Sequence, residues 1–156
     1  MYVRIGHCAG AAAALQSQTM TNPKHVVQRY LDALVAGDLD EIRESFAEDA
    51  SWTILGDLPI GSRWRGREAI VDEFLTGVAG SLYEAGSVQF EFPTLIGEGD
   101  TVVLEWRVRA RTAAGADYAN AYCGLFTVHA GRIAEVREYL DTQYAARTLF
   151  GAAAPA

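Results

Sequence analysis

Glu138 is the residue whose type and position most clearly suit acid–base chemistry. It lies in an otherwise apolar side of a predicted strand, together with Val136 and Leu140. A carboxylate on the buried side of a sheet costs free energy unless it is paired or used, and burial raises its pKa toward the range of a general base. The alternative is a structural role, in which the carboxylate is solvated or paired with an arginine near the strand end.

Asn120 and Tyr122 could assist such a carboxylate. They lie on one side of the preceding predicted strand, where they alternate with Tyr118 and Gly124. An amide and a phenol can both donate hydrogen bonds to a carbonyl oxygen or an enolate. The candidate catalytic set is therefore Glu138, which would move a proton, with Tyr122 and Asn120, which would stabilise the oxygen.

The elements that must position these side chains follow an α-α-β-α-β-β-β-β order with a short last helix. Pro23 suits the start of the first helix, Gly37 its end, and the spacing of Asp38 and Glu41 is that of a capping box. The expected helices are 23–35, one from 38, 67–78 and 142–150, and the expected strands are 50–55, 88–96, 101–112, 117–129 and 132–140. Asp141 is expected to cap the last helix. This order predicts an α+β fold with a mostly antiparallel sheet.

Alternation separates the two faces of the predicted strand 101–112. One face is apolar and is expected to pack on the helices: Val102, Leu104, Trp106, Val108 and Ala110. The other is mostly charged and is expected to be exposed or to meet a partner: Val103, Glu105, Arg107, Arg109 and Arg111. Strict alternation in the last strand places Ile133, Glu135, Arg137 and Tyr139 on the face opposite Glu138.

Three stretches of the chain resemble the SnoaL-like branch of the nuclear-transport-factor-2 superfamily: YLDALVAGDLDEIRESFAEDA, WRGREAI and YANAYCGLFTVHAGRIAEVREYLDT. Relatives in that superfamily include ketosteroid isomerases, limonene-epoxide hydrolases and polyketide cyclases. The resemblance covers residues 22–150, which we expect to form one domain, with 1–21 and 151–156 as tails. It implies a cone-shaped, cystatin-like α+β fold in which a bent sheet wraps three helices around a deep apolar pocket, usually in a homodimer.

The resemblance implies a pocket wall without an intact mechanism. Ketosteroid isomerases carry a base aspartate where this chain has Ile54, and their oxyanion-hole tyrosine could correspond to Tyr30. Epoxide hydrolases carry polar residues where this chain has tryptophan, isoleucine and valine, and only their last-strand acid has a counterpart, Glu138. The residues that the resemblance places in contact with a ligand are Trp52, Ile54, Trp106, Val108 and Tyr30.

Composition excludes several classes of function. The chain has 156 residues, the length of one domain, and a net charge of −7, which disfavours nucleic acid and anionic membranes as partners. No apolar run reaches the ~20 residues of a membrane-spanning helix. The two cysteines, Cys8 and Cys123, lack metal-ligand spacing and indicate a reducing cytoplasm. Residues 1–20 fit a short signal peptide, a disordered tail or a true start at Met20.

Three functional hypotheses follow. The first is an isomerase or cyclase that acts on a small, mostly apolar molecule without metal or cofactor, since the chain carries no metal, nucleotide or serine-nucleophile motif. The second is a non-catalytic binding module, and the third a dimerisation module that uses the charged outer face. Epoxide hydrolysis is less favoured. Two further residues are candidates. Trp64 could line the pocket or belong to the core, and Asp57 could contact the substrate at the pocket mouth or be a turn residue.

Overall fold

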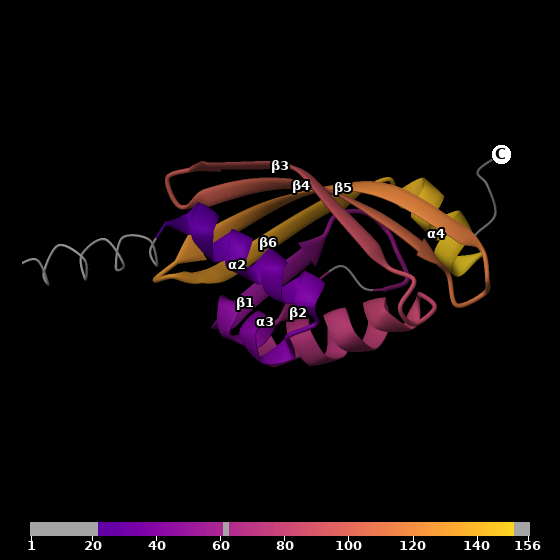
Figure 1. Ribbon diagram of the computed structural model, residues 1–156, viewed down its shortest axis with the longest axis horizontal. Helices are drawn as coiled ribbons and strands as arrows, with labels where there is room; N and C mark the ends of the chain where they lie inside the picture. Colours follow the sequence, from indigo (N-terminus) through magenta and orange to yellow (C-terminus); the bar gives the residue numbers. More distant parts are fainter. Residues whose placement is uncertain (1–21, 61–62, 152–156) are drawn as a thin grey trace, which may run out of the picture.

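The protein is built on one bent, six-stranded sheet, with most of the helices on one side of it and the last helix at one end (Figure 1). The computed structural model describes residues 22–60 and 63–151. The predicted tails, 1–21 and 151–156, lie outside the described residues except for Gly151. The elements in chain order are α2 (Pro23–Ala36), α3 (Leu39–Ser45), β1 (Phe46–Ile54), β2 (Arg63–Arg65), η1 (Ala69–Ala79), β3 (Gln89–Glu98), β4 (Thr101–Arg111), β5 (Asp117–His129), β6 (Arg132–Leu140) and α4 (Thr142–Phe150).

The strand order in the sheet is β2-β1-β6-β5-β4-β3. Strands β1 and β6 pair in parallel, and every other neighbouring pair is antiparallel, so the prediction of a mostly antiparallel α+β sheet is confirmed. The parallel pair sets Ile54 beside Glu138, and the β5–β6 pair sets Gly124 on its other side. The last strand therefore runs through the middle of the sheet, with β1 on one side and β5 on the other, and the side chains of both neighbours flank its inward side chains.

Helix ends follow the predicted signals. Gly37 ends α2 with φ +70°, a backbone angle that favours glycine. The Asp38 side chain accepts a hydrogen bond from the Glu41 backbone N–H at 3.1 Å, and Asp141 accepts one from the Tyr144 N–H at 2.9 Å. Each carboxylate satisfies a backbone donor that has no partner within its helix.

The first half of the sheet differs from the prediction. Strand β1 begins at Phe46 rather than at residue 50. Its register with β6 is irregular between Phe46 and Ser51, so the first residues of the strand do not alternate regularly between the two faces. The short strand β2 is absent from the predicted strands, because three residues are too few to display a period. The predicted helix 67–78 is present as η1, but it is wound as a π-helix over Ala69–Ala79.

The face assignments hold in β4 and β5 and fail at one place in β6. Val102, Leu104 and Val108 are buried, while Arg107 and Arg109 on the opposite face are exposed. In β6, Ile133 was predicted to share a face with Glu135, yet it is fully buried. A bulge causes this, because Thr127 and Val128 are consecutive whereas their partners Glu135 and Ile133 are two residues apart.

The outer face of the sheet has no covering element among the described residues. On this face, Arg107 and Arg109 each lie within 4 Å of the carboxylate of Glu91. The partly exposed Tyr139 lies on it as well. The expected homodimer stays a prediction. Within the described residues, no helix is long and apolar enough to cross a membrane.

Replacing Asp141 with alanine tests whether the cap holds α4 in place. The variant loses the hydrogen bond to the Tyr144 N–H, so we expect its free energy of unfolding to fall by about 1 kcal/mol in urea titrations. Asp57→Ala is the matched control, because Asp57 is an exposed loop acid. Equal losses in the two variants would contradict a capping role.

Candidate functional site

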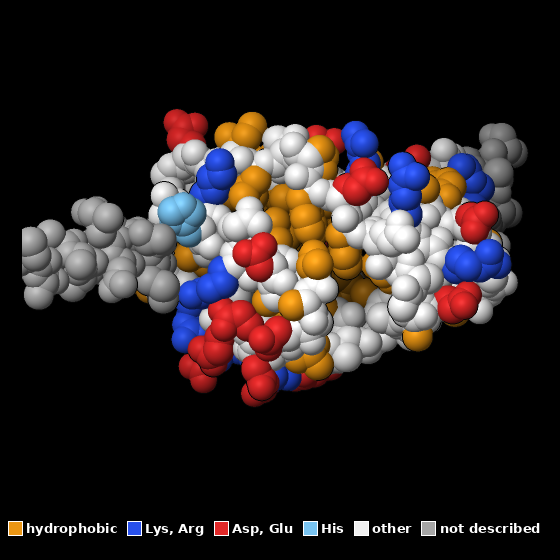
Figure 2. Space-filling model, in the orientation of Figure 1, with side chains coloured by type: hydrophobic (Ala, Val, Ile, Leu, Met, Phe, Trp, Pro, Cys, Tyr) orange, Lys and Arg blue, Asp and Glu red, His pale blue; other side chains and the backbone are white. Residues whose placement is uncertain are grey.

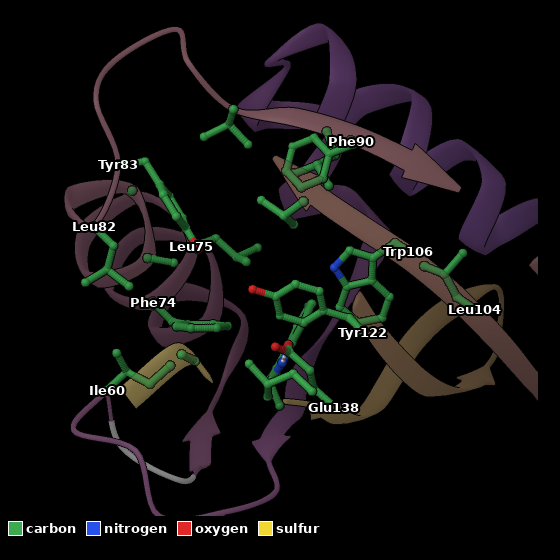
Figure 3. A pocket seen from close by; sticks show the side chains of 18 of the residues that line it. Ile60, Phe74, Leu75, Leu82, Tyr83, Phe90, Leu104, Trp106, Tyr122 and Glu138 are labelled. Carbon is green, nitrogen blue, oxygen red and sulfur yellow. Dashed lines mark hydrogen bonds between the residues drawn. The ribbon is translucent and has the colours of Figure 1, made fainter. Parts of the chain in front are cut away.

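A cavity of about 280 Å³ lies between the inner face of the sheet and the helices. Its walls come from α2, η1, α4, the strands from β3 to β6 and Trp52 of β1. Figure 2 shows a hollow with hydrophobic side chains at the centre of the view, and Figure 3 shows its interior. Most of the lining is aromatic or aliphatic, which suits a small, mostly apolar ligand.

Among the described residues, Glu138 is the one carboxylate that lines this cavity. Its side chain enters from β6 and is 7% exposed. Oε2 accepts a hydrogen bond of 2.7 Å from the indole Nε1–H of Trp52, and Oε1 has no hydrogen-bond partner among the described residues. Burial raises the pKa of Glu138 from 4.5 to about 7, and the Trp52 hydrogen bond lowers it only in part. The carboxyl can therefore exchange a proton near neutral pH.

Tyr122 points into the same cavity from β5 (Figure 3). Its ring stacks on Trp106 of β4, with centroids 5.1 Å apart and planes 10° apart. Its hydroxyl lies 2.7 Å from the hydroxyl of Tyr118. Burial raises the pKa of the Tyr122 phenol far above its ordinary value, and the nearby Tyr83 acts in the same direction. Tyr122 is therefore a neutral hydrogen-bonding group at physiological pH.

Asn120 is buried on the same face of β5 but does not line the cavity. Its Nδ2 donates to the Tyr118 hydroxyl at 3.0 Å and to the backbone oxygen of Asp141 at 3.1 Å. Its Oδ1 accepts from the Ala121 N–H at 2.9 Å. These bonds use the amide to join β5 to the start of α4, so Asn120 reaches the cavity only through Tyr118 and Tyr122.

The structure brings most of the expected ligand-binding residues to the cavity. Trp52, Trp106, Val108 and Tyr30 line it, whereas Ile54 is buried outside its lining. Among the described residues, the Tyr30 hydroxyl has no hydrogen-bond partner, and burial raises its pKa strongly with a second contribution from the charge of Glu138.

Sequence reasoning missed several parts of the wall. Tyr83, which follows η1, adds a third phenol beside Tyr118 and Tyr122, and only the fold brings it there. Phe74 of η1 lines the cavity and stacks on Trp64 at 5.4 Å, so Trp64 supports the wall from behind instead of lining it. Asp57 is exposed and does not line the cavity. Helical periodicity in 67–78 placed Phe74 among apolar residues, but gave no sign of which one faces a ligand.

Gly124 makes room for the aromatic wall beside Glu138. A Cβ at this position would lie 2.8 Å from Trp106 Cζ3 and 2.9 Å from Phe126 Cε2, closer than side chains tolerate. The absence of a side chain at Gly124 lets the Trp106 ring lie across the strand. The stack of Trp106 on Tyr122 therefore depends on this glycine.

The variant Gly124→Ala tests that dependence. We expect a loss of about 1–3 kcal/mol in the free energy of unfolding and a changed Trp106 fluorescence, because the indole ring must move. Gly97→Ala is the matched control, since the added Cβ would lie 3.4 Å from its nearest neighbour, the Cβ of Lys24. A Gly124 variant as stable as the Gly97 variant would show that the ring does not need this space.

Among the described residues, no group of three or more His, Cys, Asp or Glu side chains is placed to hold a metal ion. Among the described lining residues, the groups that can do chemistry are the Glu138 carboxyl, the indole N–H of Trp52 that is bonded to it, the indole N–H of Trp106 and three phenols. They suit proton transfer and hydrogen bonding to a ligand oxygen.

Several solved structures share this fold. Bal32a, from a soil-derived mobile gene cassette, is 26% identical with a TM-score of 0.72 over 84% of this chain and 98% of its own. TerC, co-crystallised with polyporic acid, is 20% identical with a TM-score of 0.69 over 82% and 98%. An LEH-like epoxide hydrolase of M. tuberculosis is 23% identical with a TM-score of 0.63 over 83% and 90%.

A family model for the SnoaL-like domain matches residues 27–136. This span runs from α2 into β6 and includes Trp52, Trp106 and Tyr122, although it stops two residues before Glu138. The match covers more than half of the chain, and the nuclear-transport-factor-2-like fold of the neighbours agrees with it. The chain belongs to the SnoaL-like domain family.

Proposed function

We propose that this protein binds a small, mostly apolar carbonyl compound in the cavity and moves a proton on it with Glu138, in an isomerisation or cyclisation that uses no cofactor. The observation that carries the proposal is a buried carboxyl, held by Trp52 at one oxygen, inside an otherwise apolar cavity. Two structural neighbours, one co-crystallised with polyporic acid and one an epoxide hydrolase, support small-molecule binding by this fold.

The proposed step begins with ionised Glu138. Oε1 takes a proton from a carbon next to the ligand carbonyl, and the electron pair of that C–H bond moves toward the carbonyl oxygen. Tyr122 donates a hydrogen bond to that oxygen as its negative charge grows. In a ligand with a C=C bond one position further from the carbonyl, the product of this step is a dienolate. Neutral Glu138 then returns the proton to the far carbon of that C=C bond, the C=O bond re-forms, and the C=C bond ends next to it, which completes an isomerisation and restores the carboxylate. Trp52 keeps Oε2 fixed throughout, so the carboxyl does not rotate away.

Asn120 has a positioning role in this proposal. Its amide holds the Tyr118 hydroxyl, which in turn lies 2.7 Å from the Tyr122 hydroxyl. The orientation of the amide is set by its partners, because the Asp141 carbonyl can only accept and the Ala121 N–H can only donate. Tyr118 thus accepts from Asn120 and can donate to Tyr122, which leaves the Tyr122 proton for the ligand.

The second candidate function is a binding module without catalysis. Two observations favour it. The described lining residues include no second carboxyl and no imidazole, and Ile54 stands where ketosteroid isomerases carry their base aspartate. Epoxide hydrolysis has less support, because Trp106 and Val108 occupy places where those enzymes carry polar residues. The two leading candidates differ in whether Glu138 transfers a proton.

The pH dependence of stability tests the state of Glu138. In the unfolded chain its pKa is near 4.5, and in the folded protein it is about 7. The folded state therefore holds the proton more tightly, so this contribution to stability is complete below pH 4.5 and is lost as the pH rises to 7. The shift corresponds to roughly 3 kcal/mol, since one pKa unit is about 1.4 kcal/mol.

We compare wild type with Glu138→Gln, which cannot titrate and still accepts from Trp52. Between about pH 5 and pH 8, wild type should lose roughly 3 kcal/mol more unfolding free energy than the variant in urea titrations. Glu48→Gln, an exposed strand carboxyl, is the control and should follow wild type. Parallel curves for wild type and the Glu138 variant would mean that the carboxyl titrates normally.

The base role can be tested without the natural substrate. The probe 5-nitrobenzisoxazole is flat, neutral and small, and it opens to a coloured phenolate when a base removes its carbon-bound proton and the N–O bond breaks. We expect wild type to accelerate this reaction with saturation, more so as the pH rises through 7, and Glu138→Gln to be at least ~100-fold slower.

Glu48→Gln should retain the wild-type rate. A Glu138 variant as active as wild type, or a wild type no faster than free acetate, would exclude Glu138 as a base. Saturable binding of the probe without turnover would favour the binding module.

A further inference from the structure

We propose that the cavity selects its ligand by charge: it admits uncharged lipophiles and lipophilic protonated amines, and it rejects carboxylates, sulfates and phosphates. Glu138 is the specificity-determining residue. This inference rests on the proposed function only in taking the cavity as the ligand site. It does not require Glu138 to transfer a proton.

The lining of the cavity carries one side chain that can be charged at neutral pH. Of the residues that line it, Glu138 is the single acid, and none of those described is a lysine, arginine or histidine. The other ionisable groups that face Glu138 are the phenols of Tyr30 on α2, Tyr122 on β5 and Tyr83 after η1. Burial raises the pKa of each phenol, so all three stay neutral over the working range of pH.

An anionic ligand would meet no compensating charge in this cavity. It would lose its hydration among aromatic and aliphatic side chains, and no cationic side chain of the lining would replace that hydration. Above about pH 7 it would also face the carboxylate of Glu138, which the indole of Trp52 stabilises without neutralising. The net charge of −7 disfavours the approach of anions as well.

A protonated amine would meet the opposite conditions. Glu138 supplies the counter-charge, and its Oε1 has no hydrogen-bond partner among the described residues. The ring of Trp52 lies beside the carboxyl, and the ring centroids of Phe74 and Phe126 lie 5.5 and 6.1 Å from that of Trp52; all three side chains line the cavity. Aromatic faces attract cations, most strongly where water is excluded. An uncharged ligand carries no charge that must be desolvated, and the burial of its apolar surface favours binding.

Three probes with the same naphthalene body separate these cases: 2-naphthylmethylammonium, 2-acetylnaphthalene and 2-naphthoate. Their dissociation constants are measured by isothermal titration calorimetry on the full chain at about pH 8, where Glu138 is ionised. We expect the ammonium and the ketone to bind, and the naphthoate to bind at least about tenfold more weakly than the ammonium. The Glu138 carboxylate attracts the ammonium and repels the naphthoate at contact distance, and a Coulomb energy of this kind is large enough for that difference.

Glu138→Gln should bring the ammonium and naphthoate affinities within about threefold of each other while the ketone affinity changes little. Glu48→Gln, which removes an exposed charge outside the cavity, should leave the wild-type ranking intact. Retained binding of the ketone shows that the Glu138 variant is folded. Should that variant fail to fold, the wild-type protein at about pH 5 supplies the same comparison, because Glu138 is then neutral and the discrimination should shrink.

Equal affinities of the ammonium and the naphthoate for wild type at about pH 8 would overturn the proposal. So would a ranking that Glu138→Gln leaves unchanged, or the failure of all three probes to bind. The outcome is separate from that of the base test: a protein that ranks the probes by charge but does not open 5-nitrobenzisoxazole is a charge-selective binding module. A protein that opens the probe but ranks all three equally has a base at Glu138 and no charge selection.

Discussion

The hydrogen bond between Glu138 and Trp52 is the interaction on which the rest of the site depends. A carboxyl that is 7% exposed and has no cationic partner in the cavity lining would be costly if it were left without any partner. One indole N–H at 2.7 Å reduces that cost and fixes the orientation of the group, yet it leaves the pKa raised to about 7. The single bond is strong enough to hold the carboxyl and too weak to keep it fully ionised.

The sheet provides the geometry for this arrangement. Parallel pairing of β1 with β6 brings Trp52 near Glu138 although 86 positions separate them in the chain. Antiparallel pairing of β5 with β6 places Gly124 next to Glu138, and the missing side chain there admits the ring of Trp106. The positions of the aromatic wall and of the acid therefore both follow from the same strand order.

Sequence periodicity was sufficient for the outline of this site. Alternation in β4 correctly placed Trp106 and Val108 on the inner face, alternation in β5 put Tyr122 on one side together with Asn120, and the unusual acid in β6 pointed to Glu138. Glycine and aspartate signals located the ends of α2 and the start of α4. These features are local, so the chain displays them without knowledge of its tertiary neighbours.

Other features depend on long-range packing and could not be predicted. The bulge that turns Ile133 inward interrupts a period that the residues themselves appear to keep, and β2 is too short to have one. Asn120 has the right residue type and the right face, but its amide bonds to Tyr118 and Asp141, and the structure alone reveals that. Tyr83 follows a helix with no pattern that marks it, and only the closure of the fold brings it to the cavity.

A direct titration of Glu138 tests whether burial keeps this carboxyl protonated up to neutral pH. The side-chain carboxyl is followed by carbon-13 NMR as the pH is raised, and Glu138→Gln identifies its resonance. We expect a midpoint at about pH 7, well above the ordinary pKa of 4.5. A midpoint near 4.5 would mean that water or a cation stabilises the carboxylate, and Glu138 would then be neither a base poised near neutral pH nor an unpaired charge in an apolar cavity.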